Sequence, residues 1–369
     1  MGQADEIVAL VLQGGGALGA YQGGAAQGIF ESGSSIDWVA GISIGAINAA
    51  ILCGNEPSQG LQNIRTFWER ISSARVIQEQ FESYLPRGLV NELSAASTAV
   101  TGAPGFFKLR VPPAAVMPPG ADGAISFYDT APLRETLLEL VDFDRLNSGK
   151  TRLSVGAVNI ETGNMTWFDN TEIEIRTEHI MASGALPPEF PPVEIDGSLY
   201  WDGGLVSNTP LQYVLDERMP HENLSVFQID LFSARGRVPA SVWTSEAREK
   251  DIRFSSRTRF NTDMMRRMHQ TRAAARRLYG KLPAELRNDP DALSLISGNA
   301  DPRISIAHLI YRQSRHEHQS KDYEFSRRSM EGHWSSGLRD ARKTLAHPKW
   351  KGRGTSEDRI QVFDLNNIR

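Results

Sequence analysis

The stretch that decides the fold is Val8–Gly24, with the sequence VALVLQGGGALGAYQGG. A short apolar run enters three consecutive glycines, and a segment of small residues follows them. A strand, a glycine loop and a helix in this order present main-chain N–H groups to negative charge, because glycine leaves the backbone bare where the helix begins. The stretch therefore predicts an anion-binding loop. The charge that it holds is either a permanent phosphate or an oxyanion that forms only during a reaction.

The residues around this loop alternate between strand and helix patterns. Ile7–Leu12 predicts a buried strand, Ala20–Glu31 predicts a helix, and Asp37–Ile42 predicts a second strand. A small, apolar helix is expected at Gly45–Leu52. This order is typical of a βαβ unit, so we expect an α/β fold with a parallel sheet.

Composition and charge disfavour several classes of protein. The 369 residues are 40% hydrophobic and 23% charged, which is typical of a globular protein, and the formal net charge of -4 argues against a nucleic-acid partner. Cys53 is the single cysteine, so the chain forms no internal disulfide and no zinc site of the finger type. The N-terminal stretch resembles neither a signal peptide nor a membrane span. We therefore expect a cytoplasmic protein that contacts membranes, if at all, at their surface.

The glycine loop by itself fits more than one kind of site. Gly14–Gly19, GGGALG, matches the G-x-G-x-x-G pattern of dinucleotide-binding loops. That pattern also needs an acidic residue at the end of the second strand, and Asp37 instead begins that strand. A P-loop needs a lysine directly after the last glycine, where this chain has Ala20.

A second motif follows the second strand and favours a hydrolase. Gly41–Gly45, GISIG, is G-x-S-x-G at a strand-to-helix junction, which is the pattern of a nucleophile elbow with Ser43 as the nucleophile. A serine that accepts an acyl group needs N–H donors for the oxyanion of the tetrahedral intermediate. The glycine loop ends the neighbouring strand, so its three glycines are placed to donate: Gly14, Gly15 and Gly16.

An aspartate is the strongest candidate for the base that activates this serine. Asp202 ends a strand-like run in YWDGGLVSNTPL and is followed by Gly203 and Gly204. Asp-Gly-Gly is also an ordinary turn. An apolar surrounding would raise the pKa of Asp202 and suit it to act as a general base. Six histidines of the second half are expected in exposed positions without a catalytic role: His221, His269, His316, His318, His333 and His347.

Three segments in order, QGGGALGAY, GISIGAINAA and WDGGLVSNTPL, resemble the patatin-like phospholipases. These are lipid acyl hydrolases with a Ser–Asp dyad, and the resemblance covers residues 7–232. It implies a three-layer α/β/α fold around a central, mostly parallel sheet, with Ser43 as nucleophile, Asp202 as general base and the three glycines as the oxyanion loop. It implies no metal and no organic cofactor. Many members of the family also have an arginine directly after the third glycine, where this chain has Ala17.

The chain beyond the catalytic motifs changes character. We expect a catalytic domain over residues 1–240 and a mainly helical extension, packed on it, over 241–369, similar to that of some bacterial patatin-like proteins. Arg248–Gly280 holds ten Lys or Arg against three Asp or Glu. Its apolar residues share one face of a helix, which either packs on the core or lies on anionic lipid: Phe260, Met264, Met268, Ala275 and Leu278.

The resulting prediction is a serine hydrolase of lipid carboxylic esters, similar to a phospholipase A or a lysophospholipase. Its partners are a lipid or acyl-ester substrate and a membrane surface contacted through 248–280; the sequence indicates no oligomeric state. Two alternatives stay open. One is an esterase acting on a thioester or a storage polyester, and the other is a nucleotide-binding or scaffold protein with weak or no hydrolase activity.

Overall fold

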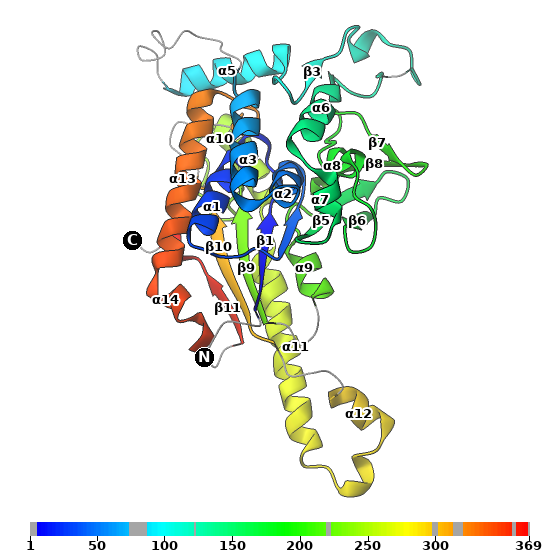
Figure 1. Ribbon diagram of the computed structural model, residues 1–369, viewed down its shortest axis with the longest axis vertical. Coiled ribbons are helices and arrows are strands. Elements are labelled where there is room, and N and C mark those ends of the chain that lie inside the picture. Colours follow the sequence, from blue (N-terminus) through cyan, green and yellow to red (C-terminus); the bar gives the residue numbers. More distant parts are fainter. Residues whose placement is uncertain are drawn as a thin grey trace.

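The computed structural model describes residues 6–73, 87–121, 123–218, 223–296, 302–312, 320–355 and 359–367. Within these ranges a nine-stranded sheet has the order β11-β10-β9-β1-β2-β5-β8-β7, and β6 pairs with β5. The strands from β11 to β5 run parallel, while β6, β7 and β8 are antiparallel to their neighbours. Helices cover both faces of this sheet (Figure 1), so the expected three-layer fold is confirmed.

The predicted strands and helices of the first third form close to where the sequence places them. The strands of the sheet are β1 (Glu6–Leu12), β2 (Trp38–Gly41), β5 (Arg152–Asn159), β6 (Met165–Asp169), β7 (Val193–Ile195), β8 (Ser198–Asp202), β9 (Asn223–Asp230), β10 (Ile304–Ile310) and β11 (Ile360–Phe363). A separate hairpin pairs β3 (Lys108–Leu109) with β4 (Tyr128–Asp129). The α-helices are α1 (Ala20–Glu31), α2 (Ile44–Cys53), α3 (Pro57–Ile71), α5 (Arg87–Thr101), α6 (Ala131–Leu140), α7 (Phe143–Asn147), α8 (Thr177–Ser183), α9 (Leu211–Glu217), α10 (Val242–Phe254), α11 (Thr258–Tyr279), α12 (Pro290–Ile296), α13 (Arg327–Ala346) and α14 (Pro348–Lys351).

The core has two halves, one on each face of the sheet. Leu10 and Leu12 of β1 pack in the cluster that includes residues of α1, α2, α3 and α13. Ala9 and Val11, which alternate with them, pack in the cluster that includes residues of α9 and Met265 of α11. Successive side chains of a strand point to opposite faces, so an apolar run without polar interruption is what a strand covered on both sides requires.

The C-terminal extension belongs to this core. α13 lies against α1, and a Cβ added to Gly24 of α1 would lie 1.9 Å from the main-chain oxygen of Trp334 in α13. The two helices therefore approach this closely only because α1 has a glycine there. The extension also adds β10 and β11 to the edge of the sheet, beside β9. The extension is mainly helical, as expected, but its two strands continue the sheet of residues 1–240, so both parts of the chain share one sheet.

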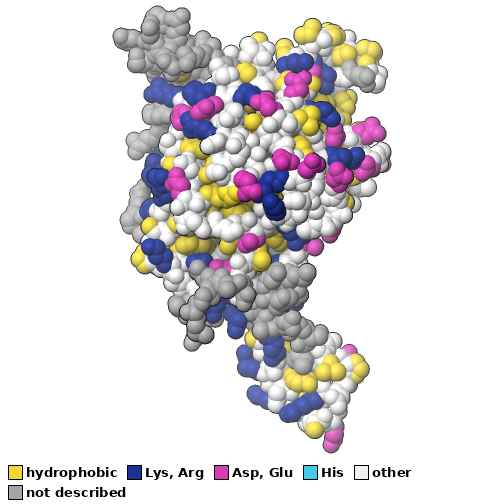
Figure 2. All heavy atoms as spheres, viewed as in Figure 1, with side chains coloured by type: hydrophobic (Ala, Val, Ile, Leu, Met, Phe, Trp, Pro, Cys, Tyr) yellow, Lys and Arg dark blue, Asp and Glu magenta, His cyan; other side chains and the backbone are white. Residues whose placement is uncertain are grey.

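Helix α11 is the segment for which packing on the core and contact with lipid were left open. Apart from Met265, which is buried, its apolar side chains are largely exposed, and they do not pack on the core: Phe260 63%, Met264 46%, Met268 44% and Leu278 59% exposed. α11 and α12 project beyond the amino ends of the strands (Figure 1), and Lys and Arg side chains gather on this projection (Figure 2). Among the described residues, no helix combines the length and apolar character needed to cross a membrane.

Candidate active site

The turn between β2 and α2 holds Ser43 in a strained conformation. Its φ of 56° and ψ of -127° lie in a region that residues other than glycine rarely adopt. The turn is tight enough that its flanking glycines cannot be replaced without movement. A Cβ on Gly41 would lie 2.4 Å from the oxygen of Gly45, and a Cβ on Gly45 would lie 2.4 Å from the oxygen of Leu12 in β1. The small residues of the G-x-S-x-G motif are thus required by the geometry of the turn.

A side chain that the sequence analysis missed holds the strained serine in place. The N–H of Ser43 donates to Oγ of Ser183, at 3.0 Å, and the Ser183 hydroxyl donates to the oxygen of Gly156, at 2.7 Å. Ser183 is fully buried at the end of α8, and Gly156 lies in β5. This chain of bonds ties the elbow to the strand beside β2. The segment around Ser183 carries no motif that would have identified it.

Asp202 lies at the end of β8, and its carboxyl group lies near the Ser43 hydroxyl. Asp202 is 3% exposed, and burial raises its pKa to about 7, while the Ser43 hydroxyl and the N–H of Gly204 act in the opposite direction and favour the charged form. The Gly204 bond is 2.7 Å long. Pairing of β8 with β5 sets Asp202 opposite Ala157. Gly203 packs directly on β5, since a Cβ there would lie 2.5 Å from the nearest main-chain oxygen. The two motifs predicted from the sequence therefore meet in one site.

The glycine loop lies against the same serine. A Cβ on Gly14 would lie 2.9 Å from Cβ of Ser43, so the absence of a side chain leaves the space beside the hydroxyl open. The N–H of Gly14 donates to the main-chain oxygen of Asn208, at 3.1 Å, and Nδ2 of Asn208 donates back to the Gly14 oxygen. This corrects the expectation that Gly14 donates to an oxyanion. Half-exposed Gly15 and Gly16 have N–H groups that bond to no other described residue.

The far side of the loop is held by the C-terminal extension. The N–H of Ala17 donates to the main-chain oxygen of Asp322, at 2.8 Å. Gly16 has a φ of +54°, and a Cβ there would lie 2.3 Å from the same oxygen. Nothing in the sequence marks this contact, because every residue has a main-chain carbonyl and no residue type distinguishes the one that is used.

The histidines are placed differently from the expectation. His221, His316 and His318 lie outside the described residues, as does the side chain of His269. His347 is half-buried and caps α14. His333 is 3% exposed, not solvent-exposed as expected, and its Nδ1 lies 3.4 Å from the main-chain oxygen of Ala17. Among the described residues, His, Cys, Asp and Glu side chains form no group of three or more that could hold a metal ion.

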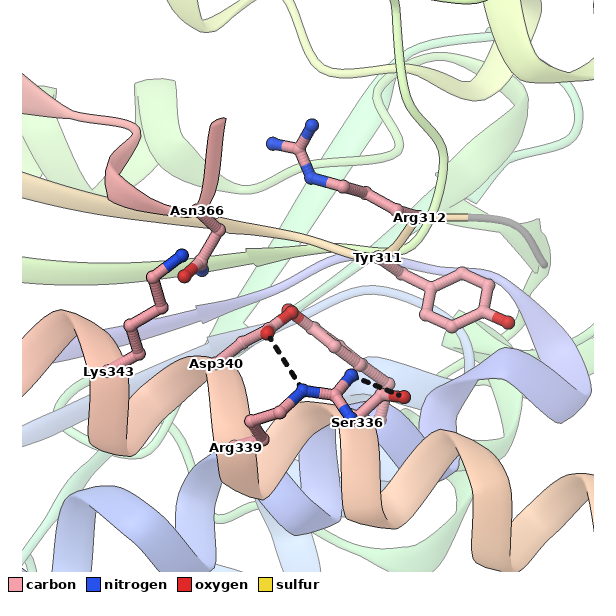
Figure 3. Close-up of a pocket in the computed structure, with 8 residues that line it drawn as sticks. Tyr311, Arg312, Ser336, Arg339, Asp340, Lys343 and Asn366 are labelled. Carbon is pink, nitrogen blue, oxygen red and sulfur yellow. Dashed lines mark hydrogen bonds and ion pairs between the residues drawn. The ribbon is translucent and has the colours of Figure 1, made fainter. Parts of the chain in front are cut away.

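A cavity of about 210 Å³ lies outside this site (Figure 3). It is bordered by α13, by the residues that directly follow β10, and by Asn366 near the C-terminus. Its lining contains Tyr311, Arg312, Asp340 and Lys343, and none of the residues predicted from the catalytic motifs. Asp340 accepts a hydrogen bond from Tyr21 of α1, at 2.9 Å. This cavity is therefore distinct from the space beside Ser43.

Comparison with family models identifies the chain. A model described as patatin-like phospholipase matches residues 10–215, which contain all three motifs. The chain belongs to the patatin-like phospholipase family. A second model, described as patatin phospholipase, matches residues 252–357 of the extension. As a member of this family the protein is a lipid ester hydrolase. No curated protein matches it by sequence.

Solved structures resemble this patatin-like protein at low identity. The crystal structure of VipD from Legionella pneumophila has a TM-score of 0.39 and 14% identity, covering 92% of this chain and 67% of that chain. The crystal structure of the type III effector protein ExoU has a TM-score of 0.36 and 13% identity, covering 95% of this chain and 54% of that chain. The heterodimeric ExoU–SpcU complex from Pseudomonas aeruginosa has a TM-score of 0.31 and 15% identity, covering 92% and 76%. The chain thus spans about half of the length of the ExoU crystal structure.

Proposed function

We propose that the protein hydrolyses lipid carboxylic esters with Ser43 as nucleophile and Asp202 as its general base. The observation that carries the proposal is that the Ser43 hydroxyl interacts with a buried carboxylate, Asp202, whose pKa is raised to about 7. A base is most effective when its pKa lies near the working pH, since it is then both ionised and able to take a proton. The nearby N–H groups of Gly15 and Gly16 are the proposed oxyanion donors, and Gly14 leaves room for the acyl group.

The proposed reaction proceeds in two steps. Ionised Asp202 takes the Ser43 proton as Oγ attacks the ester carbonyl, and the N–H groups of Gly15 and Gly16 stabilise the negative oxygen of the tetrahedral intermediate. The C–O bond to the alcohol breaks, and Asp202 returns the proton to the leaving oxygen. Asp202 then takes a proton from water as the water oxygen attacks the acyl-serine. The bond from the acyl carbon to Oγ breaks, and Asp202 returns the proton to Oγ, which releases the fatty acid and restores both Ser43 and the ionised Asp202.

The proposed substrates are phospholipids or lysophospholipids, cleaved at a carboxylic ester. Apolar side chains near the hairpin of β3 and β4 support a lipid substrate, because Val111 is 90% exposed and Val116 is 72% exposed. This loop lies at the end of the sheet to which the parallel strands point (Figure 1). Ser43 lies at the same end, because it directly follows the carboxyl end of β2. Esters of other acids, including thioesters and storage polyesters, are the alternative for the same dyad.

A fluorophosphonate probe, followed by a panel of esters, tests this proposal. We expect the probe to label Ser43, and we expect Ser43→Ala and Asp202→Asn to abolish both labelling and hydrolysis while the fold is kept. Ser32→Ala, which changes an exposed serine at the end of α1, is the matched control and should behave as the wild type. Hydrolysis that persists in purified Ser43→Ala protein would refute the assignment. The panel, with acyl chains and head groups varied one at a time, separates a phospholipase from an esterase on other acyl groups.

Contact of residues 248–280 with a membrane stays a prediction. The exposed apolar side chains of α11, such as Phe260, and its many arginines support contact with an anionic lipid surface. The projection lies at the opposite end of the sheet from Ser43 (Figure 1), so such contact would tether the protein without presenting lipid to the site. Sedimentation with neutral and anionic vesicles at low and high salt tests this. We expect binding to anionic vesicles that salt weakens, and equal recovery with both kinds of vesicle would count against it.

A further inference from the structure

The proposed oxyanion donors lie between two main-chain tethers that come from different parts of the chain. Asn208, in the segment that follows Asp202, holds Gly14 by two hydrogen bonds. On the other side, both polar groups of Ala17 are held by the extension. Its N–H donates to the oxygen of Asp322, at 2.8 Å, and its oxygen lies 3.4 Å from Nδ1 of His333. Gly15 and Gly16 lie between these tethers, and their N–H groups bond to no other described residue.

A loop of this composition depends on such tethers. Glycine has the widest choice of backbone conformations, so three in a row do not fix the direction of their own N–H groups. Stabilising an oxyanion needs donors fixed in position before the reaction, because donors that must reorient lose most of their effect. The hydrogen bond from Ala17 to Asp322 fixes the peptide plane that follows Gly16. The plane before Gly16, which contains the Gly16 N–H, is held by the bond from the Leu18 N–H to the Gly15 oxygen, at 3.2 Å. The two planes meet at the Cα of Gly16, so the extension constrains the direction of the Gly16 N–H from one side.

Two crossed ion pairs hold Asp322 in position. We call residues 320–325 the docking segment. Nζ of Lys250 in α10 lies 2.8 and 2.9 Å from the two carboxylate oxygens of Asp322. Nζ of Lys321 lies 2.5 Å from Oδ1 of Asp251 in α10. All four side chains are mostly buried, with 24% of Lys250, 13% of Asp322, 2% of Lys321 and 13% of Asp251 exposed. Helix α10 and the docking segment each supply one lysine and one aspartate, so neither charge is left without its partner.

Contacts at both ends keep the docking segment against the catalytic domain. Ser320 donates to Glu92 of α5, at 2.9 Å. The Phe325 ring packs against Phe106, with ring centroids 6.0 Å apart. These contacts place the segment on residues far from it in sequence, and the ion pairs with α10 lie between them. A surface loop that only connected β10 to α13 would not need this number of buried contacts.

We propose that Lys250, Asp322, Lys321, Asp251 and His333 are positioning residues for the oxyanion loop, so that the C-terminal extension completes the active site. The inference rests on the proposed function. In this arrangement the loop is supported from outside, through a segment that is held by the ion pairs of Lys250 and Lys321. The loop's own motif has no charged residue after the third glycine, where Ala17 stands. Because the contact to Ala17 is made by a main-chain oxygen, the side-chain pairs act by fixing the segment and not by touching the substrate.

The test removes one ion pair and measures turnover separately from binding. Lys250→Met/Asp322→Asn removes both charges and nearly keeps the side-chain volumes, so it avoids a buried carboxylate without a partner. With a soluble short-chain ester, we expect kcat and the rate of fluorophosphonate labelling to fall about tenfold to hundredfold, as for a displaced catalytic group. KM should stay within about twofold, since the loop acts mainly in the transition state. Lys250→Arg, which keeps the charge, should retain at least about a third of kcat.

Arg342→Met is the matched control. It breaks an ion pair of 2.7 Å between α13 and Glu31 of α1, which is also a link between extension and catalytic domain but does not contact the loop. We expect its kcat to equal that of the wild type. Wild-type kcat in the folded double variant, or a loss confined to KM, overturns the inference.

Failure of folding and failure of the proposed function give different results. If urea denaturation shows that the double variant is unfolded in buffer, the single variant Asp322→Asn decides. A fall in kcat of about threefold or more with unchanged KM supports the inference, and unchanged kcat overturns it. If the wild-type protein itself shows no labelling of Ser43, the proposed function is wrong, and this is seen before any extension variant is compared.

Discussion

Replacing Asp202 by asparagine should change how the stability of the protein depends on pH. Asparagine has almost the same shape but cannot ionise, so the substitution removes the buried charge alone. The pKa of Asp202 rises from 3.8 to about 7 on folding, chiefly because burial penalises the carboxylate. Between these values the folded protein holds a proton that the unfolded chain has released. Stability therefore falls as the pH rises from about 4 to about 7.

The size of this effect follows from the same two values. A pKa difference of about 3 corresponds to about 4 kcal/mol of unfolding free energy, all of which is lost above pH 7. Between pH 5 and pH 8 the ionisation of Asp202 should lower the unfolding free energy of the wild type by about 2 to 3 kcal/mol. Asp202→Asn lacks this loss, so it should be the more stable protein at pH 8 although it is inactive.

Urea denaturation of both proteins at pH 5, 6, 7 and 8 measures the difference directly. The gap between the two unfolding free energies should widen by about 2 to 3 kcal/mol over this range. Ser43→Ala is the control, because it keeps the buried carboxylate and loses only one bond that favours its charged form. Its stability should fall with pH at least as steeply as that of the wild type. Parallel curves for wild type and Asp202→Asn would refute the argument, since Asp202 would then titrate alike in both states.

Three further predictions follow from the same site. The pH profile of kcat/KM should rise with an apparent pKa of about 7, because only ionised Asp202 takes the serine proton, and a rate that stays flat from pH 5 to pH 8 would argue against this base. Ser183→Ala leaves the part-buried N–H of Ser43 without its acceptor, so we expect the unfolding free energy in urea denaturation to fall by about 1 to 3 kcal/mol and kcat to fall as well. A variant equal to the wild type in both would contradict the role of that bond. Gly45→Ala should lower the unfolding free energy by about 1 to 3 kcal/mol, because the added Cβ meets main-chain atoms of β1. Gly184→Ala is the control and should be tolerated, because the nearest atom to its added Cβ is 3.8 Å away. Equal stability of the two variants would show that the elbow relaxes.

The C-terminal half shows where sequence patterns were insufficient. Ile304–Ile310 is rich in β-branched residues and forms β10, but it follows a long charged, helical region and was included in a mainly helical extension. A short apolar run indicates a strand only when something else shows that a sheet edge is available to it. The sequence also could not decide what contacts the apolar face of α11, because helical periodicity reveals only which residues share a face. It does not reveal whether the protein provides anything to cover that face.

The sequence by itself determined the local geometry of the catalytic motifs. The strand, glycine loop and helix of residues 6–31 and the elbow at Ser43 depend on sterics within a few residues, and glycines are required wherever main-chain atoms approach closely. Only the tertiary structure decided which N–H groups of the loop are available. Asn208 occupies that of Gly14 and Asp322 occupies that of Ala17, both through main-chain oxygens. A carbonyl oxygen belongs to every residue, so its choice depends on how distant segments pack and leaves no signature in the residue types.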